Sequence, residues 1–171
     1  MGELITFKVK VKKMNATAVR NVTINDVAQY FLSQESMTHK KLQKLCYYAY
    51  AWNLALHDEY LFTDKFQAWV HGPVSPGLYQ EYKVYGWNEI PQPGELPQSV
   101  QENERIMNIL ELVYNSYRDF DGDELEILTH QEDPWLNARG GIPEHFPSNS
   151  VIEDRIIREY YRNVFEADQN I

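Results

Sequence analysis

The sequence has few of the features on which covalent, metal-based or membrane functions depend. Its 171 residues include one cysteine, Cys46, which excludes an intramolecular disulfide and a cysteine-based zinc site. No stretch approaches the ~18 consecutive apolar residues of a membrane-spanning helix, and the N-terminus lacks the apolar run of a signal peptide. We therefore expect a cytoplasmic protein whose length suffices to bury a core without disulfides.

Catalytic motifs are equally scarce. The glycines form neither a Walker loop nor a dinucleotide-binding fingerprint, and no two of the five histidines have the spacing of a zincin. Cys46 lies on the apolar side of a predicted helix, where a buried thiol is inert. One catalytic alternative stays open, a metal-dependent enzyme in which the fold brings together His71, His130 and Asp133. Otherwise the sequence indicates a protein that is not an enzyme and needs no cofactor.

The charge is acidic overall but unevenly distributed. The chain carries 16 Lys and Arg against 25 Asp and Glu, a net charge of −9. Residues 1–22 have a net charge of +4 and the remainder −13, and the densest acidic stretch, residues 119–133, contains no Lys or Arg. This balance disfavours general nucleic-acid binding, which needs cations to displace phosphate counterions. A basic protein partner suits the acidic stretch, although a solvated helix face gives the same pattern.

Hydrophobic periodicity predicts a mainly α fold, a single domain of about six or seven helices with a small N-terminal β-hairpin or edge strand. Residues 5–11 alternate apolar and polar side chains, as in a half-buried strand, and residues 17–22 are its weaker partner. We therefore divide the chain into a basic strand-like extension, residues 1–22, and a helical domain, residues 23–171.

The helical period begins at Thr23, a predicted cap of the first helix. Thr38 opens the longest apolar helix, which extends to about His57 and is predicted to be buried on most sides. Proline after a capping residue starts two further helices, at Ser75 and at Asp133.

Other segments carry weaker signals. Residues 66–71 are predicted as a short strand or irregular segment that ends at Gly72-Pro73. Capping boxes at residues 99–102 and 150–153 predict the starts of two more helices. Of these, the second is expected to bury the row Ile156, Tyr160 and Val164.

Four segments of the sequence form an ordered set. They are KLQKLCYYAYAW (residues 41–52), AWVHGPV (68–74), LYQEYKVYG (78–86) and THQEDPWLNAR (129–139). In this order they resemble the Panacea domain of SocA-like and GepA-like antitoxins, over about residues 24–166.

The resemblance implies a mostly helical antitoxin that neutralises a cognate toxin by direct protein–protein contact. Such modules are typical of bacterial and prophage toxin–antitoxin operons, in which the toxin is encoded next to the antitoxin. The motif residues are expected to be mostly structural; they are Lys41, Leu42, Gln43, Lys44, Leu45, Tyr48, Trp52, Trp69, Gly72, Pro73, Tyr79, His130, Pro134 and Trp135.

We expect partner contacts from the basic extension, from lysines at the start of the long helix and from the acidic helix. The candidates are Phe7, Lys8, Lys10, Lys12, Lys40, Lys44, Asp123 and Glu124. A solvated face explains the lysines equally well. An adaptor that delivers a partner to a protease, or works with a chaperone, is the alternative function. The sequence leaves the oligomeric state open.

Overall fold

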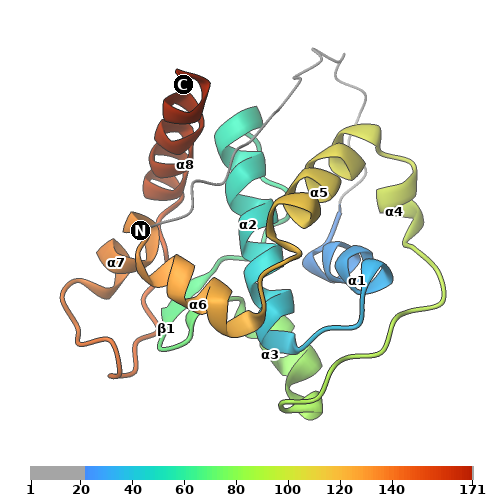
Figure 1. The fold of residues 1–171 in the computed structure, drawn as a ribbon, viewed down its shortest axis with the longest axis horizontal. Helices are drawn as coiled ribbons and strands as arrows, with labels where there is room; N and C mark the ends of the chain where they lie inside the picture. Colours follow the sequence, from blue (N-terminus) through green and yellow to red (C-terminus); the bar gives the residue numbers. More distant parts are fainter. Residues whose placement is uncertain (1–21, 171) are drawn as a thin grey trace.

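The computed structural model describes residues 22–170, and these residues form a mainly α fold (Figure 1). The N-terminal strands predicted over residues 5–11 and 17–22 lie outside the described residues, apart from Val22. The α-helices are α1 (Ile24–Gln34), α2 (His39–His57), α3 (Pro76–Tyr82), α4 (Gln98–Gln101), α5 (Glu104–Tyr117), α6 (Gly122–His130), α7 (Asp133–Arg139) and α8 (Asp154–Gln169). A 3-10 turn η1 (Lys83–Tyr85) and two strands, β1 (Gln67–Trp69) and β2 (Gly72–Val74), complete the described elements.

Helix α2 runs through the centre of the fold and is surrounded by α1, α5, α6 and α8 (Figure 1). The Thr38 side chain accepts a hydrogen bond from the Lys41 backbone N–H and caps the helix as predicted. Every residue from Lys41 to Ala55 is buried. Because each large apolar side chain fully removed from water stabilises a fold by roughly 1.5–3 kcal/mol, α2 is the main contributor to the core.

The described residues form more helices than predicted, because the segment expected to be a single helix from residue 99 onward forms two helices, α4 and α5. The capping box predicted at residues 99–102 is wrong: Ser99 lies inside the one-turn helix α4. The true cap of the following helix is Asn103, whose side chain accepts from the Ile106 backbone N–H. This helix, α5, buries Ile106, Ile109, Leu110, Val113 and Tyr117.

The last helix also begins differently from the prediction. Residue Glu153 is the N-cap of α8 and makes no side-chain capping bond, so the capping box at residues 150–153 is wrong. The buried side chains are Ile157 and Tyr161, whereas the predicted row with Tyr160 is only partly buried. Two apolar rows lie side by side on this helix, and packing against α2 selects the neighbouring one.

The observed sheet is an antiparallel hairpin between α2 and α3. Residue Gln67 pairs with Val74 and Trp69 with Gly72, so Gly72-Pro73 belongs to the second strand and does not end the segment. The turn is made by Val70 and His71. The loop before α8 is hydrogen-bonded to the outer edge of the hairpin: the Ala68 N–H donates to the Ser150 carbonyl at 2.8 Å.

Candidate functional site

Two polar side chains of α2 hold the segment that follows the hairpin. The Gln43 amide accepts from the Ser75 backbone N–H at 2.9 Å and donates to the Ser75 carbonyl at 3.1 Å. Ser75 caps α3 through its own hydroxyl, which accepts from the Leu78 N–H. One buried amide therefore satisfies both backbone groups at the start of a helix.

Lys44 is buried under the same hairpin. Its ammonium donates to the Pro73 carbonyl at 3.3 Å, and burial lowers the pKa of Lys44 to about 7. Gly72, at φ +100°, leaves the room for this side chain: a Cβ there would lie 2.5 Å from Lys44 Cε and 2.9 Å from Thr129 Oγ1. The glycine is thus required by its backbone conformation and by the space that Lys44 occupies.

A second buried polar group lies between α2, α7 and α8. The Glu132 carboxyl accepts hydrogen bonds from the Tyr48 hydroxyl at 2.6 Å and the Tyr161 hydroxyl at 3.1 Å. Burial raises the pKa of Glu132 to about 7, although both hydroxyls act in the opposite direction. Tyr48 also stacks on Tyr117, with ring centroids 4.0 Å apart, and Tyr117 accepts from the Trp52 indole N–H.

The C-terminal part of the motif fixes the hairpin from the other side. Trp135 is buried and donates its indole N–H to the Trp69 carbonyl at 2.9 Å. Arg139 donates to the Ala68 carbonyl at 3.0 Å and also to the Pro143 carbonyl at 2.8 Å. Most motif side chains therefore contact other parts of the fold, and they present little surface to a partner.

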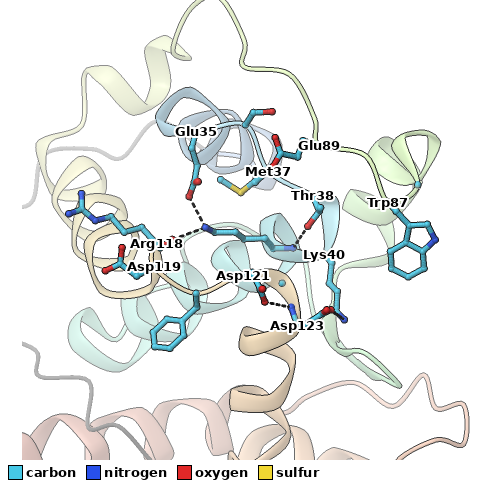
Figure 2. A pocket seen from close by; sticks show the side chains of 15 residues that line it. Glu35, Met37, Thr38, Lys40, Trp87, Glu89, Arg118, Asp119, Asp121 and Asp123 are labelled. Carbon is cyan, nitrogen blue, oxygen red and sulfur yellow. Dashed lines mark hydrogen bonds and ion pairs between the residues drawn. The ribbon is translucent and has the colours of Figure 1, made fainter.

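A surface groove of about 440 Å³ lies at the start of α2 (Figure 2). Three segments far apart in the sequence line it: residues 35–41 at the α1–α2 junction, residues 86–89 after η1, and residues 118–123 between α5 and α6. Trp87 stands on one side of the groove and Asp119 on the opposite side.

The groove is built on tight contacts. A Cβ at Gly122 would lie 3.2 Å from the Lys41 backbone nitrogen, so α6 begins directly against α2. The 86–89 segment is held by the Ile90 N–H, which donates to the Met37 carbonyl at 2.8 Å. The Ser36 hydroxyl donates to the Ile90 carbonyl at 2.6 Å. These contacts within the domain fix the walls of the groove before any partner binds.

Five carboxylates and three cations line the groove, and the two lysines are already engaged. Lys41 donates to Glu35 at 2.7 Å and to the Arg118 carbonyl at 2.8 Å. Lys40 donates to Asp123 at 2.6 Å and also pairs with Glu126, and this hydrogen bond from Lys40 lowers the pKa of Asp123. The remaining lining carboxylates are Glu89, Asp119 and Asp121.

The predicted partner residues fall in different places. Lys40 and Asp123 line the groove, and Glu124 is exposed beside it and completes a capping box with Asp121. Lys44 is buried and cannot meet a partner directly. The candidates Phe7, Lys8, Lys10 and Lys12 lie outside the described residues.

The alternative metal site is not assembled. His71 pairs with Glu126 at 3.0 Å, whereas His130 pairs with Glu144 at 2.7 Å and stacks on Trp135. Within residues 22–170, no group of three or more His, Cys, Asp or Glu side chains is arranged to hold a metal ion. The metal-dependent alternative built on His71, His130 and Asp133 therefore has no support in the geometry.

Sequence reasoning missed the aromatic side of the groove. Trp87 is 82% exposed, and Glu89 follows in the same loop. The segment has no helical or strand period that would have singled it out. Its one available signal was a tryptophan placed between Gly86 and a proline-rich loop, outside every predicted apolar face.

Comparison with known proteins identifies the domain. The family model described as "Antitoxin SocA-like, Panacea domain" matches residues 42–136, from the first turn of α2 into α7. No curated protein and no solved structure was found to match the chain. No helix among residues 22–170 is both long and apolar enough to cross a membrane. The matched residues span more than half of the chain and include the hairpin, both buried polar groups and most of the groove, so the chain belongs to the SocA-like Panacea domain family of antitoxins.

Proposed function

We propose that this protein is an antitoxin that neutralises a toxin encoded next to it, by binding the toxin directly in the cytoplasm. The match of residues 42–136 to the SocA-like antitoxin family carries the proposal. An antitoxin of this kind needs a surface that covers or holds the toxin, and no catalytic group of its own. The preformed groove at the start of α2 provides such a surface.

We propose that two parts of the chain contribute to toxin binding. We assign toxin binding to the helical domain, residues 23–171, and a supporting role to the basic extension, residues 1–22. The charges of the two parts, −13 and +4, differ in sign, so they suit different regions of one partner. The extension then contributes through Phe7, Lys8, Lys10 and Lys12.

Co-expression with the product of the adjacent reading frame tests the proposal. The adjacent product alone should stop growth, the full chain should restore it, and the two proteins should co-purify. A harmless adjacent product that also fails to co-purify contradicts the proposal.

The half-life of the toxin in the same cells separates inhibition from delivery to a protease. Inhibition by binding leaves the toxin at least as long-lived as before, because a bound protein is protected. A toxin that disappears faster when this protein is present would instead support the adaptor function.

A further inference from the structure

One exposed apolar side chain, Trp87, lines the groove without any cover from the described residues. Trp87 is 82% exposed, whereas Trp52 and Trp135 are buried and donate indole hydrogen bonds. A tryptophan left in water beside a preformed hollow can gain much apolar contact when a partner covers it. Tryptophan is also enriched among the residues that dominate binding energy at protein interfaces.

The charge of the groove indicates the chemistry of the occupant. After Lys40 and Lys41 have paired within the domain, the lining keeps three further carboxylates, Glu89, Asp119 and Asp121, against one further cation, Arg118. The Asp121 carboxylate accepts hydrogen bonds from the backbone N–H groups of residues 123 and 124. The groove is therefore negative on balance, and the −13 charge of residues 23–171 extends the same potential outward.

This potential distinguishes between occupants. A second copy of the chain would bring another acidic domain to an acidic groove, which costs electrostatic energy. A basic segment of the toxin instead gains from every carboxylate. The chain's own residues 1–22 are also basic, so they are a competing occupant of the groove.

Resting on the proposed function, we infer that the groove at the start of α2 binds a lysine- or arginine-rich segment of the toxin, with an apolar toxin side chain packed on Trp87. The cations of that segment lie against Glu89 and Asp119, on two sides of the groove. Trp87 contributes most of the affinity. The carboxylates chiefly set the rate of encounter and the register.

Titration calorimetry of full-chain variants with the purified product of the adjacent reading frame tests the inference. Trp87→Ala should weaken binding about 30-fold, a loss typical of a dominant interface residue. Its control, Ile127→Ala, removes another exposed apolar side chain outside the groove and should change the affinity less than about twofold.

A double variant that removes two groove carboxylates gives the second readout. Glu89→Gln with Asp119→Asn should weaken binding about tenfold at low salt, with a smaller loss at high salt because ions screen the groove. The matched control, Glu95→Gln with Glu166→Gln, removes the same charge from exposed positions outside the groove. Equal affinities for the groove and control variants would overturn the inference.

Carbodiimide cross-linking of the complex identifies the occupant, because it joins carboxylates to lysine amines in contact. Cross-links from Glu89 or Asp119 to toxin lysines support the inference. Cross-links only to Lys8, Lys10, Lys12 or Lys13 of the same chain, or to a second copy, overturn it. Failure of the wild-type chain to bind the toxin at all would refute the proposed function itself, whereas wild-type binding unaffected by the groove variants refutes only this inference.

Discussion

Lys44 and Glu132 are ionisable side chains buried in the core, and their titration changes the free energy of unfolding in opposite directions as the pH rises. Burial raises the pKa of Glu132 from 4.5 to about 7, so the folded state holds a proton in this range that the unfolded state has lost. The stability contributed by Glu132 is therefore fully present below pH 4.5 and is lost as the pH rises toward 7. Lys44, with its pKa lowered from 10.5 to about 7, adds stability as the pH rises between those values.

Glu132→Gln tests the carboxyl separately. Glutamine keeps an oxygen for the Tyr48 and Tyr161 hydroxyls but cannot titrate. The free energy of unfolding of the variant should therefore rise relative to that of the wild type as the pH rises. Between pH 5 and pH 8 the difference in the free energy of unfolding should grow by on the order of 3 kcal/mol, at about 1.36 kcal/mol for each pKa unit. Urea unfolding at four pH values measures it. Glu166→Gln, at an exposed position of α8, is the control, and a difference between the wild type and the Glu132→Gln variant that stays constant with pH would contradict the assignment.

Among the glycines of residues 22–170, Gly72 has the least room for an added side chain. Gly72→Ala combines an unfavourable positive φ with a Cβ 2.5 Å from Lys44 Cε, and we expect a loss of about 3 kcal/mol in the free energy of unfolding. Gly94→Ala is the matched control, because nothing lies within 4 Å of its added Cβ. Chemical denaturation of both variants measures the effect. Equal stabilities would show that the hairpin can shift without cost.

At the scale of elements, one arginine connects the hairpin to the loop before α8. Arg139 is buried, and its guanidinium donates to the carbonyls of Ala68, Pro143, Glu144 and Phe146. A guanidinium presents five donors in a fixed planar arrangement, which an ammonium cannot reproduce. The loop over residues 140–150 therefore depends on this side chain for its shape.

Arg139→Lys should loosen that loop while the helices stay folded. We expect hydrogen exchange at the Phe146 amide, which donates to the Pro143 carbonyl, to rise about tenfold, corresponding to a local loss of about 1.4 kcal/mol. Exchange measured by NMR or mass spectrometry gives the result. Arg155→Lys, at an exposed pair with Glu159, should leave this amide unchanged, and an equal effect from both variants would contradict the role of Arg139.

Elements with local start signals could be predicted, and those that depend on distant contacts could not. Thr38 and Ser75 cap helices as their sequence context predicts. The start of α8 was predicted three residues early, because a Ser-x-x-Glu pattern is only a local signal, and the observed N-cap is Glu153. Gly72 was taken as a terminator because a glycine–proline pair usually ends a segment. In the structure Gly72 instead pairs with Trp69 within the hairpin, and the buried Lys44 and Thr129 side chains occupy the space that a Cβ would need.

For the whole molecule, the family could be predicted from ordered motifs, whereas the groove could not. Its lining residues, such as Lys40, Trp87 and Asp119, come from three segments that no periodicity relates. The two predicted partner residues that do line it, Lys40 and Asp123, were found from the local density of charge. The exposed tryptophan, which we infer to contribute most of the binding energy, required the fold to be seen.

The central claim is that this domain neutralises a toxin by binding it. The most direct measurement is titration calorimetry of the full chain with the purified product of the adjacent reading frame. The account predicts a saturable complex of defined stoichiometry, with binding that weakens in high salt because the groove is negative. The contradicting result is no measurable binding at concentrations well above those at which co-expression of this chain restores growth.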